Sequence, residues 1–514
     1  MAVNPSVDLA PIFQRAADDP DDVAIADPAG VWSWSEAASA AARIASALTA
    51  LPLLRDQRIA VLGENDAATL LFYSGALLAG FGTIMLNQYL TVPEIAYILE
   101  DGEARAIWAD AGRASLARDA VVGLSDVILI GPDDATWQSA VNGASTTPPA
   151  LDLPTTTDLG YTSGTTGRPK GVTVPKEPVA TVRDRLGLAA RHHSVGLGPH
   201  LVSGPLYHGG PHAAVGLLLM GTPTILIGKF DAREALVAID RYRVASSVLV
   251  PTHLSRLLQL DEAERMSYDT SSLRLIVHTG SPCPPSVKRA VIDWFGPIVR
   301  ETYGGIESGP IASISTEEWL AHPGSTGRTV WPYEIVVIRE DGAECVIDEV
   351  GRVFARDETG EGVSYRNDPE KTAAAHLAPG LFTLGDYGRL DAEGYLYLTS
   401  RRHDLVLSGG VNIYPAEAES ILLEHPSIVD AACYGVADAD LGERLVGVVV
   451  VVSADDVTVE DVLMFCARRL ARHKTPRELH IVGEIKRNHM GKVDRRRLRA
   501  EHASTPVTRR GGGL

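Results

Sequence analysis

The chain has 514 residues, of which 45% are hydrophobic and 22% are charged, a composition typical of a well-packed globular protein. Collagen-like, coiled-coil and low-complexity classes are therefore excluded. At roughly 100–200 residues per domain, the length predicts about three folding units, with functional sites in the clefts between them. The 47 basic and 65 acidic residues give a formal charge of −18, which opposes unspecific binding to nucleic acids or anionic lipids. An anionic ligand therefore requires a site at which positive charge is locally concentrated.

Cysteine usage and hydropathy predict a cytoplasmic protein. The four cysteines, Cys283, Cys345, Cys433 and Cys466, lie far apart in the sequence, as is typical of free thiols in a reducing compartment. The N-terminus has no basic segment followed by an apolar one, and no stretch reaches the roughly 18–20 apolar residues that a membrane helix needs. We expect neither a leader peptide nor a membrane span.

The first part of the chain alternates helical and strand patterns. Helices are predicted at 34–48, 67–79 and 93–100, and strands at 58–62, 83–86 and 106–108. The alternation resumes with a helix at 236–242, a strand at 247–250, a helix at 254–260 and a strand at 273–277. Strand–helix–strand order predicts an α/β fold, in which helices cover both faces of mostly parallel sheets.

The sequence pattern changes at about residue 330. Short β runs separated by glycines at 334–338, 351–355, 381–383 and 394–398 predict a small β-barrel or β-rich subdomain over about 330–400. A smaller α+β domain is expected over 402–500, with helices at 416–423 and 459–470 and strands at 429–436 and 445–452. Residues 1–401 then form the large N-terminal domain. The tail 501–514 lacks apolar periodicity and is predicted to be disordered.

The most informative segment is a loop rich in glycine and hydroxyl side chains between Tyr161 and Gly171. Its glycines allow tight turns and close approach of a ligand, and its hydroxyls and backbone N–H groups donate to phosphate oxygens. The spacing is not that of the common P-loop, since the Gly-Lys pair and the following Ser or Thr are missing. A flexible polar surface turn is the alternative, but Lys170 favours phosphate binding.

This loop resembles the signature loop of the adenylate-forming superfamily, in particular its acyl-CoA synthetase branch of fatty-acid and aryl-acid CoA ligases. Further resemblances follow in the family's order between Trp34 and Lys492. They lie at 34–37, 56–87, 205–209, 303–307, 365–370, 384–388, 401–415 and 488–492. One such match is weak, but a collinear series over nearly the whole chain is specific. The resemblance implies two helix-covered, mostly parallel sheets plus a β-barrel subdomain, followed by a smaller, mobile C-terminal domain.

The resemblance also implies a reaction. A carboxylate, aromatic or with a medium or long acyl chain, attacks the α-phosphorus of ATP to give an acyl-adenylate and pyrophosphate. The thiol of CoA then takes the acyl group and AMP leaves. Negative charge builds up in the first step, so the protein is expected to supply positioning and electrostatic stabilisation. A hard cation such as Mg²⁺ needs only one or two carboxylates there.

By resemblance, Glu307 binds Mg²⁺, Asp386 accepts hydrogen bonds from the ribose, Arg401 contacts ribose or phosphate, and Tyr303 lies near adenine. The nucleotide site is predicted to contain Thr162, Ser163, Gly164, Thr165, Thr166, Gly167, Lys170, Gly280, Ser281 and Gly304 as well. The residues implied in catalysis are Lys492, Thr166, Glu307 and His208. Lys492 is assigned to the oxygens between the carboxylate and the α-phosphate, although a lysine in a basic segment is more often a solvated charge.

The acyl pocket and the C-terminal domain complete the implied machinery. The substrate pocket is predicted to be lined by Tyr207, His208, Thr279, Gly280, Gly305, Ile306 and Ser308. Ser408, Gly409 and Gly410 resemble the face that lines the pantetheine tunnel, where absent side chains let a thin ligand pass. Arg402 and His403 are the expected hinge about which the C-terminal domain alternates between the two half-reactions.

Two residues depart from the family pattern. Ile306 replaces a threonine, and the loss of one neutral hydrogen bond of about 0.5–1.5 kcal/mol slows adenylation up to roughly tenfold or marks an unusual substrate. His403 replaces a common Asp or Lys, which predicts a hinge that is sensitive to pH near the ionisation of histidine.

Other functions are weighed against this hypothesis. Transfer of the adenylate to a carrier-protein thiol or an unusual nucleophile stays open, as does an inactive nucleotide-binding module. The pairs His192–His193 and His208–His212 lack the pattern of a metal site, and the chain contains no nucleophile elbow or dinucleotide fingerprint. We expect ATP, CoA and a small carboxylate as partners, no nucleic acid, and leave a homodimer open.

Overall fold

The computed structural model describes residues 9–54, 56–162, 169–174, 178–401, 406–408, 411–413, 415–438, 441–452, 457–470, 474–487 and 493–502. Several predicted site residues lie outside this part: Ser163, Gly164, Thr165, Thr166, Gly167, Arg402, His403, Gly409, Gly410 and Lys492. The side chains of Thr162 and Arg401 and the predicted tail beyond residue 502 lie outside it as well.

The first sheet is parallel except at one edge. Its strand order is β6-β5-β3-β4-β7-β8, and only β8 runs antiparallel to its neighbour. The strands are β3 (Arg58–Leu62), β4 (Gly82–Met85), β5 (Ala104–Ala109), β6 (Ile128–Ile130), β7 (Asp158–Thr162) and β8 (Lys170–Val174). The helices of this region are α2 (Trp34–Thr49), α3 (Ala67–Leu78), α4 (Val92–Asp101), η1 (Ala111–Arg113), α5 (Ala114–Ala120) and α6 (Ala135–Gly143). The predicted alternation is confirmed.

The second sheet has nine strands in the order β15-β14-β13-β12-β11-β9-β10-β1-β2, with a parallel centre and antiparallel strands at both ends. The strands are β1 (Val23–Asp27), β2 (Gly30–Ser33), β9 (His200–Val202), β10 (Thr224–Leu226), β11 (Ser246–Leu249), β12 (Leu275–His278), β13 (Val299–Gly305), β14 (Gly309–Ile314) and β15 (Arg328–Thr329). The helices are α1 (Pro11–Asp18), α7 (Val182–Ala189), α8 (Gly209–Leu219), α9 (Ala232–Tyr242), α10 (Pro251–Leu258), α11 (Glu262–Arg265), α12 (Pro285–Phe295) and α13 (Thr316–Ala321).

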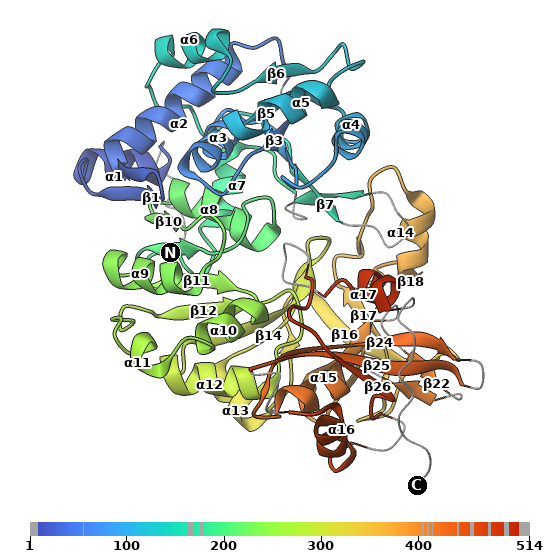
Figure 1. The fold of residues 1–514 in the computed structure, drawn as a ribbon. Helices are drawn as coiled ribbons and strands as arrows, with labels where there is room; N and C mark the ends of the chain where they lie inside the picture. Colours follow the sequence, from blue (N-terminus) through green and yellow to red (C-terminus); the bar gives the residue numbers. More distant parts are fainter. Residues whose placement is uncertain are drawn as a thin grey trace.

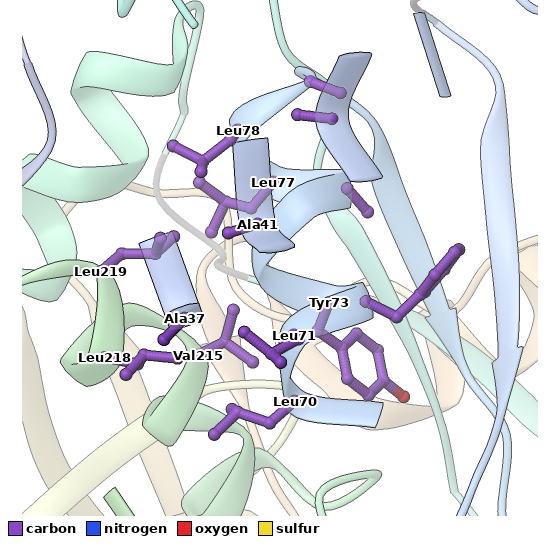
Figure 2. Packing of buried hydrophobic residues seen from close by; sticks show 14 of the residues in the cluster. Ala37, Ala41, Leu70, Leu71, Tyr73, Leu77, Leu78, Val215, Leu218 and Leu219 are labelled. Atoms are coloured by element: carbon purple, nitrogen blue, oxygen red, sulfur yellow. The ribbon is translucent and has the colours of Figure 1, made fainter. Parts of the chain in front are cut away.

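Helix α3 lies at the centre of the large core. Every residue of α3 except Ala68 is buried, because the helix is apolar on all sides. Leu70, Leu77 and their neighbours pack against alanines of α2 and against Val215 and Leu218 of α8 (Figure 2). Figure 1 shows α8 between the two sheets. The packing therefore joins both sheets into one body.

Two β-rich units follow. The first is an antiparallel sheet of β16 (Tyr333–Ile338), β17 (Gly351–Asp357), β18 (His376–Ala378), β19 (Leu381–Phe382), β20 (Asp386–Leu390) and β21 (Leu396–Arg401), together with α14 (Pro369–Ala375). The second contains β22 (Val406–Ser408), β23 (Val411–Ile413), β24 (Ile428–Asp438), β25 (Gly442–Val451), β26 (Glu478–Ile481), α15 (Pro415–Leu423), α16 (Val459–Ala467) and α17 (Arg495–His502). This red unit, the smaller α+β domain, is at the lower right in Figure 1.

Several predicted boundaries differ from the structure by two to four residues, and two of the differences have a clear physical reason. The strand predicted from 394 begins at Leu396, because Gly394 has a φ of 81° and closes a turn in which Asp391 accepts from the N–H groups of Gly394 and Tyr395. The helix predicted to reach 470 ends at Ala467, where Cys466 O accepts from both Arg469 and Leu470. None of the helices in the described part of the chain is long and apolar enough to span a bilayer.

Candidate active site

The predicted pocket segments meet at one edge of the nine-stranded sheet. Strands β9, β11, β12 and β13 are adjacent and parallel, so their carboxyl ends share an edge. Segment 203–209 follows β9, segment 279–281 follows β12, and segment 303–308 forms the end of β13 and its turn. In open α/β sheets, ligands bind at the carboxyl ends of the strands. The fold therefore gathers residues that are about 100 positions apart in the chain, roughly the length of a small domain.

Ile306 lies where three of the predicted motifs come together. Its side chain packs against both the large core and the core of the antiparallel sheet. A Cβ atom placed on Gly160 of β7 would overlap with Ile306 Cδ1, and one on Gly209 would lie 3.7 Å from Cγ1. The isoleucine thus touches the strand that enters the phosphate loop and the start of α8. The missing side chain of Gly160 is what makes room for it.

Tyr303 and Asp386, predicted at the adenine and ribose ends of the nucleotide, are in contact. The hydroxyl of Tyr303 donates to Asp386 Oδ2 over 2.8 Å. Asp386 is the first residue of β20 and only 5% exposed. The two residues predicted at opposite ends of the nucleotide are therefore joined directly by a hydrogen bond.

Glu307 stands beside this pair on the turn between β13 and β14. Gly305 leaves space for its carboxylate, because a Cβ there would overlap with Glu307 Oε2. The hydroxyl of Tyr365 lies 3.4 Å from Glu307 Oε1. In the described part of the chain, no group of three or more His, Cys, Asp or Glu side chains forms a metal cage. A single partly exposed carboxylate fits Mg²⁺, which retains waters and takes its other ligands from phosphates.

The flanks of the phosphate loop form a hairpin. Thr162 at the end of β7 pairs with Lys170 at the start of β8, so the predicted loop joins these two strands. Lys170 is partly buried. The hairpin edge and Glu307 are linked through segment 365–371, since Arg366 N donates to Gly171 O over 2.9 Å and Tyr365 reaches Glu307.

Lys371 lies next to these predicted site residues, and the sequence analysis did not identify it. Its Nζ lies 3.8 Å from the centre of the Tyr365 ring. Burial and the neighbouring Lys170 ammonium lower the pKa of Lys371 to about 8. Its position directly after the motif at 365–370 could have pointed to Lys371 in the sequence. Its proximity to Lys170 could not be predicted, because it depends on the long-range hydrogen bond between Arg366 and Gly171.

The acyl side of the edge is aromatic. The rings of Tyr207 and His208 lie 4.4 Å apart, and Tyr207 is buried. Burial, with Tyr89 nearby, raises the pKa of Tyr207, so its hydroxyl stays protonated at neutral pH. Thr279 Oγ1 donates to Thr302 O over 3.0 Å, and Gly280 adopts a φ of 91° that a glycine tolerates.

Ser308 has a local role. Its hydroxyl accepts from Gly305 N over 3.1 Å and donates to Gly309 O over 2.8 Å, and it is 6% exposed. The serine therefore fixes the turn that presents Ile306 and Glu307.

A buried charged cluster lies behind the edge and was also missed. Lys288 Nζ is 2.6 Å and His278 Nε2 is 3.3 Å from Glu301 Oε2, and the side chains of Lys288 and His278 have no solvent exposure. Burial raises the pKa of Glu301, but His278 and Lys288 lower it by more, so it stays below its usual range. The cluster ties β12 and β13 to α12, just before Thr279 and Tyr303.

In the C-terminal domain, two ion pairs flank the segment that contains Lys492. Arg487 pairs with Asp430 of β24, and Arg495 pairs with Glu419 of α15 at 2.6 Å. Arg487 also forms an isolated β-bridge with Val493. Ser408 is 8% exposed at the end of β22.

Comparison with known proteins agrees with this geometry. Residues 12–361 match the family described as AMP-binding enzyme, and residues 417–492 match its C-terminal domain. The chain is 31% identical to 2-succinylbenzoate–CoA ligase of Bacillus velezensis over 493 residues, which cover 95% of this chain and 96% of that one.

Two solved structures have the same fold along nearly their whole length. One is o-succinylbenzoate coenzyme A synthetase (MenE) from Bacillus subtilis in complex with ATP and magnesium ion, with TM-score 0.77, 27% identity, and coverage of 95% of this chain and 99% of that one. The other is the amide bond synthetase McbA from Marinactinospora thermotolerans, with TM-score 0.80, 25% identity, and coverage of 95% and 99%. As its motif order predicts, this chain belongs to the AMP-binding enzyme family, within the adenylate-forming superfamily.

Proposed function

We propose that this chain is an AMP-forming acid–thiol ligase, which activates a carboxylic acid with ATP and passes the acyl group to CoA. The observation that carries the proposal is the convergence of four parts at one edge. These are the β7–β8 hairpin, Glu307, the Tyr303–Asp386 pair and the aromatic segment 207–208. A nucleotide and an acyl chain on opposite sides of Ile306 bring a carboxylate to the α-phosphorus.

In the first half-reaction, a carboxylate oxygen attacks the α-phosphorus, and the bond to the pyrophosphate oxygen breaks. Asp386 orients the ribose by accepting from its hydroxyls, with Tyr303 holding the carboxylate in place. Lys170 and the phosphate loop hold the β- and γ-phosphates. Glu307 would hold Mg²⁺ together with the phosphates, and the ion would offset the negative charge of the leaving group.

In the second half-reaction, the CoA thiolate attacks the acyl carbonyl and AMP leaves. We propose that the C-terminal domain turns about Arg402 and His403 between the two steps, so that Lys492 is replaced by the face at Ser408. The domain boundary at 401/402 is part of this proposal. The role of Lys492 is supported by Asp430 and Glu419, which pair with Arg487 and Arg495 on either side of its segment.

The pocket supports an aromatic or extended acyl substrate. Tyr207 and Ile306 contribute apolar side chains to the predicted pocket, and Gly280 adds none. The relative from Bacillus velezensis is named for 2-succinylbenzoate, an aromatic acid. We infer that this chain accepts an aryl or medium-chain acid better than acetate.

The decisive experiment is a screen of carboxylic acids with ATP and CoA, reading pyrophosphate release and the mass of the product. Lys492→Ala is then compared with the native protein in both half-reactions. We expect it to lose adenylation far more than thioester formation from supplied acyl-adenylate. Lys486→Ala, which removes an exposed lysine from the same domain, is the control. Equal loss of both half-reactions in Lys492→Ala contradicts the role of this lysine.

A second candidate is transfer of the adenylate to an amine. The likeness to the amide bond synthetase McbA favours it, as does Ile306 in the place of the family's threonine. The same screen separates the two functions when CoA is replaced by a panel of amines or a carrier protein. An amide formed faster than the thioester would make the amine the natural acceptor.

We also propose a cytoplasmic location, which is supported by four free cysteines and by the absence of a membrane-spanning helix in the described residues. Assembly into a homodimer stays a prediction, and light scattering of the purified protein at several concentrations tests it.

A further inference from the structure

Lys371 is held in place beside the predicted phosphate site. It lies in the first turn of α14, where Asp368 accepts from its backbone N–H over 2.9 Å and Pro369 begins the helix. Its ammonium sits 3.8 Å from the centre of the ring of Tyr365, a residue that is 8% exposed. A cation held on a buried aromatic face has little freedom to swing into solvent.

Three elements bring charges together at this point. Tyr365, beneath Lys371, donates to Glu307 of the β13–β14 turn over 3.4 Å. Arg366 N donates to Gly171 O of β8, the residue after Lys170. The ammonium of Lys371 therefore lies near that of Lys170 and near the carboxylates of Glu307 and Asp368, with which it interacts.

The two lysines of this group differ from the neighbouring arginine in how their charges are paired. Arg366 is neutralised by Glu103 at 2.9 Å and also donates to Asp101 O. In the part of the chain that the structure describes, neither Lys170 nor Lys371 forms an ion pair. Two neighbouring ammonium groups share this half-buried place with the carboxylates of Glu307 and Asp368, and Asp368 is held by the backbone N–H of Lys371. The ammonium groups of Lys170 and Lys371 repel each other, and a bound polyanion removes the repulsion.

We propose that Lys371 is a second lysine of the polyphosphate site, which binds the β- and γ-phosphates of ATP and then the pyrophosphate product; this rests on the proposed function. A compact ammonium with three donors suits a cluster of phosphate oxygens. Lys170 approaches from the hairpin and Lys371 from α14. The terminal phosphates are therefore held from two sides, and AMP, which lacks them, is not.

The test compares ligands with and without the terminal phosphates. Calorimetry with a nonhydrolysable ATP analogue and with AMP is done on Lys371→Met, Lys371→Arg and the native protein. We expect Lys371→Met to weaken binding of the ATP analogue roughly 10–100-fold, the range for a lost charged hydrogen bond, and to leave AMP within about twofold. Lys371→Arg keeps the charge and is expected within about threefold of native for both ligands.

Lys229→Met, which removes an exposed lysine after β10, is the charge control. Equal weakening of both ligands in Lys371→Met would show a merely structural role on Tyr365, and unchanged binding of the ATP analogue would overturn the proposal outright. In turnover, inhibition by pyrophosphate is expected to weaken in parallel with ATP binding. The calorimetry needs neither a carboxylic acid nor CoA. Its result can therefore be interpreted even if the chain is not an acid–thiol ligase.

Discussion

Some residues at the candidate site depend on each other for space, and Gly160 and Ile306 are the clearest pair. Ile306 occupies the space that a side chain on Gly160 would need. The family resemblance at 303–307 identifies Ile306 as a departure, but its partner on β7 becomes visible only in the structure. The isoleucine in place of the family's threonine therefore packs between the predicted nucleotide site and the predicted acyl pocket.

We predict that Gly160→Ala lowers adenylation at least tenfold, because the new methyl group displaces Ile306 from the turn that carries Glu307. Ile306→Val removes Cδ1, the atom that is in the way, and in combination with Gly160→Ala is expected to restore most of the activity. The measurement is carboxylate-dependent pyrophosphate release in the two single variants and the double variant.

Gly187→Ala on α7, where a Cβ meets nothing within 4 Å, is the control and should keep native activity. Additive losses in the double variant would show that the two residues do not compete for the same space.

Asp158 is a buried residue whose ionisation is expected to affect the stability of the fold. It accepts from Thr83 N and Oγ1 at 2.7 and 2.8 Å, pairs with Arg185, and lies 3.8 Å from His212. Burial raises the pKa of Asp158, but Arg185 and His212 lower it by more, to about 2 from the usual 3.8. Because the pKa of Asp158 is lower in the folded than in the unfolded state, its carboxylate stabilises the folded state at pH values above 3.8. That stability is lost as the pH falls toward 2.

We predict that Asp158→Asn costs about 3–5 kcal/mol at pH 5, because Arg185 is left buried and unpaired. The difference in unfolding free energy between native and variant should shrink by about 1 kcal/mol between pH 5 and pH 3. Denaturant titrations at both pH values measure it. A difference that is the same at pH 5 and pH 3 would remove Asp158 as the titrating group.

At the scale of elements, helices and strands were predictable where local signals agree. Helix α2 begins at Trp34 because Ser33 and Glu36 form a capping box, and α3 begins after its cap Asp66. The strand at 396 was misplaced because Gly394 belongs to a turn held by Asp391, a side-chain contact that periodicity does not show. Lys371 and the Lys288–Glu301–His278 cluster were missed because each depends on contacts between separate elements.

The two ion pairs that flank the Lys492 segment make a prediction about β24 and α15. Asp430→Asn frees Arg487 and is expected to slow adenylation about tenfold, since the segment loses one anchor, while thioester formation from supplied acyl-adenylate stays within about twofold. Single-turnover assays of the two half-reactions measure the split.

Glu478→Gln, which breaks the similarly buried pair with Arg444 on the β25–β26 side, is the matched control. A loss in both half-reactions of Asp430→Asn, or the same loss in Glu478→Gln, would mean that the pair stabilises the domain generally and does not position Lys492.

At the scale of the whole molecule, an acidic chain of formal charge −18 binds a polyanion only where local cations are concentrated. In our proposal, Lys170 and Lys371 supply these cations where the β7–β8 hairpin approaches the antiparallel sheet and the nine-stranded sheet. The small C-terminal domain contacts the large one, where Gln259 Nε2 donates to Val429 O over 3.2 Å.

The central claim is that a carboxylate oxygen attacks the α-phosphorus of ATP at this edge, and isotope transfer tests it most directly. With a substrate acid labelled with oxygen-18 in both carboxylate positions, the account predicts one labelled oxygen in the AMP released after thioester formation, and none in pyrophosphate. Label appearing in inorganic phosphate, with ADP as the nucleotide product, would place the attack at the γ-phosphorus and contradict it.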